Sequence, residues 1–285
     1  MILNETHTLS NGIRIPKLGL GTWFIPDGEA AEAVRTAVSM GYRHIDTAQA
    51  YENEAGVGEG VRTCGLPREQ IFVTSKVAAE HKDYASAARS IDETLEKTGL
   101  DYLDMMIIHS PQPWADFRGG DYVEGNREAW RALEDAYIAG KLRAIGVSNF
   151  KKPNLDNILS ACRVKPMVNQ ILLHISNTDE ELLEYCRAQG ILAEAYSPIA
   201  HGEALKNPAI ADMAKKYDVS TAQLCIRYVL ELGAVALPKT ANPEHMKTNA
   251  EVDFTIAPAD MEILKHTVPI KDYGEFSFFP VFSGK

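Results

Sequence analysis

The sequence predicts a single α/β domain folded as a (β/α)8 barrel with an N-terminal β-hairpin. Eight short apolar runs alternate with segments of helical periodicity, which is typical of a parallel sheet built from β-α units. Three of these runs end in an ionisable residue, as strands do at the catalytic mouth of such a barrel. A length of 285 residues suits one barrel of this kind.

The first element is a β-hairpin, because Asn11-Gly12 separates two short alternating runs. The eight apolar runs follow at 18–22, 43–46, 71–76, 103–109, 143–149, 167–170, 191–198 and 234–240. Their nearly continuous apolar character is typical of strands that are covered on both faces. Eight is the number of strands that a closed parallel barrel needs.

The segments between the runs have the spacing and ends of helices. The clearest are 28–41, 83–99, 178–190 and 221–233, each of which ends at a glycine. Two other segments stand out. A long connection at about 110–126 contains Trp114 and the pair Gly119-Gly120. The tail, 271–285, is rich in aromatic residues.

We expect one domain over residues 1–285, with the connection and the tail beside a substrate pocket. Long loops in compact barrels are usually functional or disordered. A plain plug for the end of the barrel is the alternative for the tail.

Composition narrows the possible function classes. A net charge of −10 makes the chain a poor candidate for binding nucleic acid or an anionic membrane. No apolar stretch approaches the roughly 20 residues of a membrane span, and the first residues do not resemble a signal peptide. The four cysteines are scattered without a C-x-x-C pair. We therefore expect a cytoplasmic protein with reduced thiols. We also expect a monomer, although the sequence does not reveal the oligomeric state.

Four residues carry the chemistry: Asp46, Tyr51, Lys76 and His109. Asp46, Lys76 and His109 each end an apolar run, and Tyr51 follows Asp46 at the start of the next helical stretch. A neighbouring ammonium such as that of Lys76 lowers the pKa of a phenol from about 10. Tyr51 could then give a proton to a carbonyl oxygen while hydride reaches the carbon, and His109 could orient the substrate. This site needs no metal.

The motifs that surround these residues resemble the aldo-keto reductases over essentially the whole chain. The matching segments are 19–23, 41–58, 74–76, 103–111, 140–150, 168–170, 195–198 and 237–240. The most specific are "HIDTAQAYENE" and "GVSNF". The resemblance implies a (β/α)8 barrel, reduction of aldehydes or ketones by a nicotinamide cofactor, and the same four catalytic residues.

The resemblance also implies a cofactor site. Ser148, Asn149 and Gln170 match residues that hold the nicotinamide amide, and Tyr196 matches the ring that stacks on it. The other positions expected to contact the cofactor are Gly21, Thr22, Asp46, Ser197, Lys239, Thr240, His245 and Asn249. Those expected to contact the substrate are Trp23, Tyr51, His109 and Trp114.

One departure from the family pattern concerns the choice of cofactor. The family clamps the 2′-phosphate of NADPH with a lysine and an arginine; here Lys239 is present, but His245 stands at the arginine position. Arginine offers a permanent charge and a planar fork, which histidine lacks. We therefore expect NADPH as the cofactor, with NADH also possible.

Two other function classes remain open at this stage. The first is a metal-dependent barrel hydrolase that uses His44, Asp46, His109 and His174, since Zn²⁺ takes such ligands. The second is an inactive family member that senses cofactor, against which the intact set of four residues argues. The barrel alone decides neither, because it hosts many chemistries.

Overall fold

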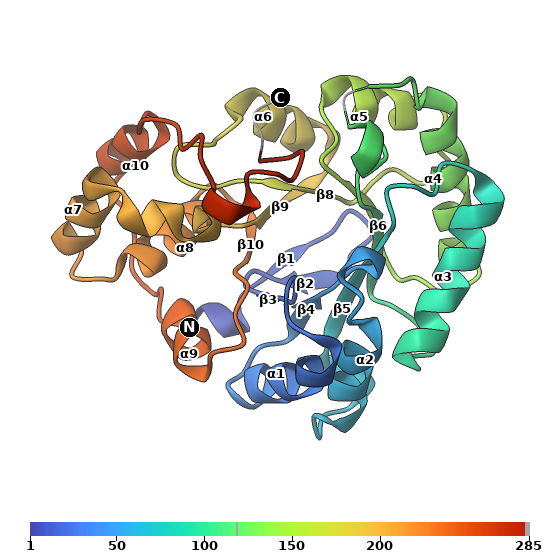
Figure 1. The fold of residues 1–285 in the computed structure, drawn as a ribbon, viewed down its shortest axis with the longest axis horizontal. Helices are drawn as coiled ribbons and strands as arrows, with labels where there is room; N and C mark the ends of the chain where they lie inside the picture. The colour runs from blue at the N-terminus through green and yellow to red at the C-terminus, as the bar shows by residue number, and fades with distance from the viewer. Residues whose placement is uncertain (118, 283–285) are drawn as a thin grey trace.

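Eight parallel strands form the centre of the molecule in this computed structural model, which describes residues 1–117 and 119–282 (Figure 1). In chain order the strands are β3 (Leu20–Gly21), β4 (His44–Asp46), β5 (Phe72–Val77), β6 (Met105–Ile108), β7 (Ile145–Ser148), β8 (Val168–Leu172), β9 (Leu192–Tyr196) and β10 (Val235–Leu237). Each strand pairs with the next. Parallel bridges from Leu18 to Ala236 and from Gly21 to Lys239 join the two ends of the sheet. The predicted barrel is confirmed.

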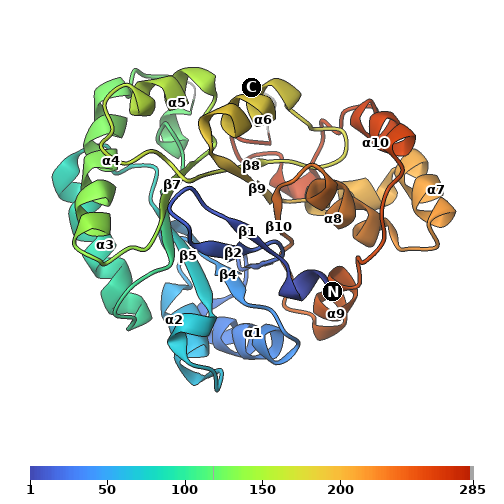
Figure 2. The ribbon, with the colours of Figure 1, turned by 180° about the vertical axis from the view of Figure 1, so that it is seen from behind.

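The predicted N-terminal hairpin is also confirmed. Strands β1 (Thr6–Thr8) and β2 (Arg14–Pro16) pair antiparallel, and Gly12 takes a left-handed conformation in the turn between them. Figure 2 shows the hairpin in front of the barrel, on the side opposite to the view of Figure 1. The side chain of Ile15 is fully buried there. The hairpin therefore covers the end of the barrel at which the strands begin.

The helices surround the barrel (Figure 1). They are α1 (Asp27–Ser39), α2 (Glu54–Thr63), α3 (Tyr84–Thr98), α4 (Val123–Ile138), α5 (Lys152–Leu159), α6 (Glu180–Gln189), α7 (Pro208–Lys216), α8 (Thr221–Glu231), α9 (Pro243–Ala250) and α10 (Pro258–Lys265). The sequence signals at their ends work as expected. Asp83 accepts a hydrogen bond from the Ser86 amide at the start of α3, and Gly99 and Gly190 end α3 and α6 in left-handed conformations.

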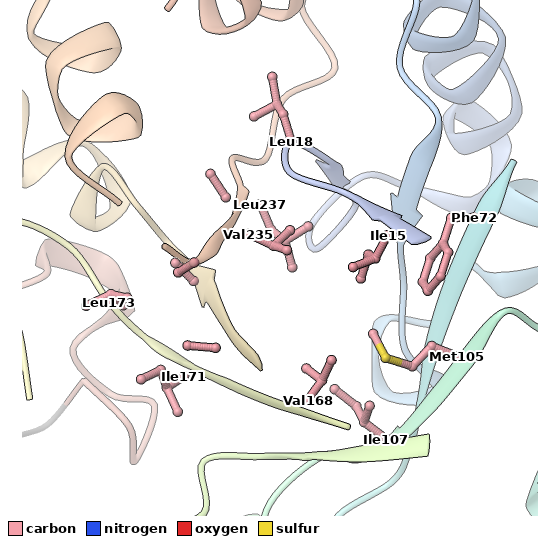
Figure 3. Packing of buried hydrophobic residues seen from close by; sticks show 14 of the residues in the cluster. Ile15, Leu18, Phe72, Met105, Ile107, Val168, Ile171, Leu173, Val235 and Leu237 are labelled. Carbon is pink, nitrogen blue, oxygen red and sulfur yellow. The ribbon is translucent and has the colours of Figure 1, made fainter. Parts of the chain in front are cut away.

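Apolar side chains fill the interior between the hairpin and the opposite mouth. Figure 3 shows Ile15 of the hairpin near Phe72 and Met105, with Ile107 and Val168 close by. All five are buried. This packed layer fills the hairpin end of the barrel in the described part of the chain, and functional sites of such barrels lie at the opposite end, where the strands finish.

The connection after β6 differs from the prediction at its far end. Helix α4 begins at Val123, so residues 123–126 are helical and the loop is shorter than expected. The loop holds a 3-10 turn, Trp114–Asp116, and the tail holds another, Gly274–Phe276. Residue 118 of this loop and residues 283–285 of the tail lie outside the described residues. Among the helices of the described part, none has the length and apolarity needed to cross a membrane.

Candidate active site

A cavity of about 500 Å³ opens at the ends of the strands. The predicted site residues that line it are Gly21, Thr22, Trp23, Asp46, Tyr51, His109, Trp114, Ser148, Asn149, Gln170, Tyr196, Ser197 and Lys239. Four others do not line it: Lys76 lies beneath, and Thr240, His245 and Asn249 follow β10. His245 is exposed on α9, whereas Asn249 is buried on the same helix.

Lys76 forms the base of the site. It is fully buried on β5, and its Nζ lies 2.6 Å from Asp46 Oδ2 and 2.8 Å from the Thr47 carbonyl oxygen. The same Nζ lies 4.7 Å from the centre of the Tyr51 ring. A buried ammonium of this kind persists only with a counter-charge, which Asp46 supplies. Lys76 is therefore held between a carboxylate and a phenol.

The pKa of Tyr51 differs from the prediction in its net direction. Burial of the phenol raises its pKa, and although the Lys76 charge opposes this, the net shift is upward. For Lys76, burial is the largest single influence and lowers the pKa, but the Asp46 carboxylate and the Tyr51 phenol together raise it by more, so the net shift is again upward. Tyr51 also lies in a 3-10 turn, Gln49–Tyr51, that precedes α2. The phenol thus holds its proton and faces a permanent cation.

His109 completes the group. Its ring centre lies 5.7 Å from that of Tyr51 and 5.1 Å from that of Trp114. Burial, with the charges of Lys76 and Lys82, holds the pKa of His109 well below its usual range, so the imidazole is neutral. Its Nδ1 is buried without a hydrogen-bond partner. The His109 side chain nevertheless lines the cavity, which makes its ring a candidate contact for a ligand.

Hydrogen-bonding groups gather on the other side of the cavity. Tyr196 donates to Asn149 Oδ1 over 2.7 Å, and Asn149 Nδ2 donates to the His109 carbonyl oxygen. Gln170 Nε2 donates to Asp46 Oδ1 over 2.8 Å, which connects this group to the ion pair. Asn149 and Ser197 both have positive φ angles, of 62° and 51°. Such strained backbone is concentrated at ligand sites.

Aromatic residues of the tail form the outer wall, with partners that sequence reasoning missed. Phe279 lies 4.8 Å from Trp23 between ring centres, and Phe276 stacks on His201 at 4.2 Å. Phe24 and His201, which also line the cavity, were not predicted. The "GLGTWF" run could have indicated Phe24, since it directly follows Trp23. Nothing in the sequence around His201 indicated its contact with the tail.

The ligand set of a metal hydrolase does not assemble. Asp46 is engaged by Lys76 and Gln170, and His174 contacts the Ile175 carbonyl oxygen and the Tyr273 hydroxyl. Within residues 1–117 and 119–282, no three His, Cys, Asp or Glu side chains gather to hold a metal ion.

The barrel and its site therefore define a class of oxidoreductase, and comparison with known proteins gives its family. The model of the Aldo/keto reductase family matches residues 17–268. Glyoxal reductase of Bacillus subtilis is 41% identical over 262 residues, which cover 91% of each chain. Glycerol 2-dehydrogenase (NADP(+)) of Saccharomyces cerevisiae is 36% identical over 282 residues, covering 91% of this chain and 89% of that protein.

A solved structure agrees. The aldo/keto reductase from Brucella melitensis has a TM-score of 0.85 at 36% identity, covering 92% of this chain and 98% of that one. The chain belongs to the aldo-keto reductase family. It is an oxidoreductase of a family that uses NAD(P)H generally, and the predicted family resemblance is confirmed.

The cavity fits such a cofactor. A nicotinamide ends in a primary amide, and the side-chain oxygens of Ser148, Asn149 and Gln170 offer acceptors for it on the cavity wall, while the donors of these side chains are used within the protein. Tyr196, which is hydrogen-bonded to Asn149, supplies an aromatic ring, and Lys239 supplies a cation that also lines the cavity. Together these groups suit a nucleotide that has a flat, amide-bearing ring at one end and phosphate groups farther along.

Proposed function

We propose that the protein reduces an aldehyde or ketone to an alcohol with NADPH, and that Tyr51 is the proton donor. The observation that carries this proposal is the burial of Lys76 between Asp46 and the Tyr51 ring beneath the cavity. The Lys76 charge is already balanced by Asp46, so the Tyr51 phenol is not required beside it for charge balance. The Lys76 charge does stabilise the phenolate that proton donation leaves behind.

Each residue then has a distinct role. When bound, the cofactor supplies a hydride to the carbonyl carbon. Tyr51 gives its proton to the carbonyl oxygen, Lys76 stabilises the resulting phenolate, and Asp46 keeps Lys76 charged and in place. A neutral His109 donates a hydrogen bond to the same oxygen and orients the substrate.

NADPH is proposed over NADH because Lys239 lines the cavity, where it can meet the 2′-phosphate. Thr240, His245 and Asn249 are proposed to contact the adenosine end, and Gly21, Thr22 and Ser197 the middle of the cofactor. The yeast relative is a glycerol 2-dehydrogenase (NADP(+)), which supports the same preference. Use of NADH remains part of the proposal, since His245 brings no guanidinium.

The substrate is proposed to lie against Trp23 and Trp114, which line the cavity on the side of Tyr51 and His109. The loop that carries Trp114 and the aromatic tail form the wall of this part of the cavity. The names of relatives, such as glyoxal reductase, agree with a small-molecule carbonyl substrate.

Tyr51→Phe tests the proposal. The change removes the phenolic proton and keeps the ring, so kcat for carbonyl reduction should fall by about 10²–10⁴-fold or more. The dissociation constant of NADPH, from fluorescence titration, should stay nearly constant. Tyr185→Phe is the matched control, because the Tyr185 hydroxyl contacts Asp156 away from the cavity. Near-parental turnover by Tyr51→Phe would refute the assignment.

A further inference from the structure

Besides Asp46, another buried carboxyl group, that of Glu194, lies next to Gln170 of the cavity wall. Glu194 is on β9 and has no exposed surface. In the sheet it pairs with Gln170 of β8, so the two side chains lie on the same, inner face of the barrel. Neither the four catalytic residues nor the cofactor positions predicted from the sequence include it.

Glu194 is connected to the site through one amide group. Gln170 Nε2 donates to Asp46 Oδ1 over 2.8 Å and to Glu194 Oε2 over 3.0 Å. Both amide hydrogens are thereby used by carboxyl groups inside the barrel. The amide oxygen is the part of Gln170 that can serve a ligand in the cavity. The hydrogen bond to Asp46 alone fixes which way the Gln170 amide faces. The charge on Glu194 can therefore change without altering the orientation of that amide.

The charges around Glu194 do not balance it. Asp46 and Lys76 already form an ion pair with each other. His44 Nε2 lies 4.0 Å from Glu194 Oε1, but burial lowers the pKa of His44 to about 3, so the imidazole is neutral. Glu194 Oε1 and His44 Nδ1 are both buried without a hydrogen-bond partner. The neighbour on β10, Val235, is apolar. An ionised Glu194 is therefore one negative charge in excess.

Burial, reinforced by the Asp46 charge, raises the pKa of Glu194 to about 8. Around neutral pH this carboxyl group keeps its proton. A positive charge arriving at the cavity wall would favour loss of that proton, because opposite charges stabilise the ionised form. The oxidised nicotinamide ring carries such a charge and the reduced ring does not.

We propose that Glu194 is a positioning residue that matches the charge of the site to the oxidation state of the cofactor. Glu194 is protonated with reduced cofactor and ionised with oxidised cofactor, and the proton goes to solvent. Its charge acts on the nicotinamide across Gln170, whose position stays the same, and Glu194 touches neither substrate nor the reacting atoms. The inference rests on the nicotinamide cofactor of the proposed function. It makes the relative affinity for the two oxidation states depend on pH.

Proton release on binding tests this directly. Calorimetric titrations with NADP⁺ and with NADPH, in two buffers of different ionisation enthalpy, count the protons released. At about pH 7, the binding of NADP⁺ to the parent should release at least roughly half a proton more than the binding of NADPH does. A release of this size corresponds to a Glu194 pKa that NADP⁺ lowers by about one unit or more. Affinity for NADP⁺ should rise about tenfold from about pH 6 to about pH 9 for each unit of that shift.

Glu194→Gln should abolish both effects. Its amide oxygen can still accept from Gln170, so the geometry is kept while the titration is removed. The matched control is Glu54→Gln: Glu54 is also a buried carboxyl with a raised pKa, but it bonds the Ser75 and Thr94 hydroxyls and does not line the cavity. This control should keep the parental proton count. All three proteins are also measured with Tyr51→Phe, which removes the phenolic proton of the catalytic group as a source of the release.

An infrared spectrum of the protein without cofactor gives a second readout. The carboxylic acid band of Glu194 should be present at about pH 7, diminish when NADP⁺ is added, and be absent from Glu194→Gln. Equal proton release by the parent and Glu194→Gln overturns the inference while leaving the proposed reductase intact. If neither NADP⁺ nor NADPH binds to the parent, the proposed function is overturned instead.

Discussion

Lys76 is buried between a carboxylate and a phenol, so its charge acts on both partners. It opposes the rise in the Tyr51 pKa that burial causes. Without the ammonium, that pKa would be higher still. The phenolate form, which must accept a proton when the reaction runs toward alcohol oxidation, would then appear only at higher pH.

Lys76→Met should therefore lower kcat and move the pH profile of alcohol oxidation to higher pH. Asp46 also loses its counter-charge in this variant, and breaking one side of a buried pair is itself destabilising. Thermal unfolding must be followed in parallel to keep the two effects apart. Lys152→Met, on the exposed face of α5 beside Asp156, is the control. If Lys76→Met keeps the parental profile, Lys76 does not act on Tyr51.

His245 is exposed at the start of α9, outside the cavity that Lys239 lines. His245→Arg should tighten NADPH more than NADH, since only NADPH carries the 2′-phosphate. A hydrogen bond to a charged group contributes about 1.5–3 kcal/mol, so the preference should move by roughly 10- to 100-fold. Glu251→Gln changes the net charge by the same amount without adding a guanidinium, which makes it a charge-matched control. Equal tightening of both cofactors would place residue 245 away from the phosphate.

At the scale of elements, the strand ends were predictable and the tail contacts were not. Asp46, Lys76 and His109 close apolar runs, and a parallel barrel brings such ends together by its topology. The tail meets Trp23 and His201 across some 75 to 250 positions of sequence. Local pattern carries no information on such contacts. Helix α4 begins earlier than the sequence predicts, because the glycines and aromatic residues around its start are typical of a loop.

The tail offers a test with an internal control, since Phe278 and Phe279 are neighbours with different surroundings. Phe279 lies 4.8 Å from Trp23 and lines the cavity, whereas Phe278 is 73% exposed. Phe279→Ala should raise KM for bulky apolar aldehydes several-fold, because it removes an aromatic contact from the pocket wall. The dissociation constant of NADPH should not change, and Phe278→Ala should resemble the parent. Matching KM values for the two variants across a substrate panel would make the tail a plug.

At the scale of the whole molecule, the barrel interior is layered from apolar to ionisable. The hairpin end is filled by apolar side chains, Glu194 and His44 lie deeper in the barrel than the cavity, and the Lys76–Asp46 pair lies next to the cavity. This middle layer was not predicted from the sequence, because Glu194 lies inside the apolar run 191–198, which is typical of a buried strand. Its position two residues before Tyr196, on the same face, was the available signal. Reasoning from apolar periodicity passes over a single buried acid.

That buried acid should shape the stability of the whole fold. In the unfolded chain Glu194 loses its proton near its ordinary pKa of 4.5, but in the folded chain its pKa is raised to about 8, so it keeps the proton up to that pH. Between these values the folded state binds more protons, so the free energy of unfolding falls as pH rises. Each pKa unit corresponds to about 1.4 kcal/mol. Glu194 thus stabilises the fold most at low pH and least above about pH 8.

Glu194→Gln removes this dependence. Relative to the parent, the melting temperature of the variant should therefore increase steadily from about pH 5 to about pH 8.5 and then level off. Differential scanning fluorimetry without cofactor measures the difference at each pH, so that titrations shared by both proteins cancel. Glu59→Gln, which alters an exposed carboxyl on α2, should show a flat difference. A flat difference for Glu194→Gln as well would mean that Glu194 is already ionised in the folded protein. The buried carboxyl would then have no proton to release when an oxidised nicotinamide binds.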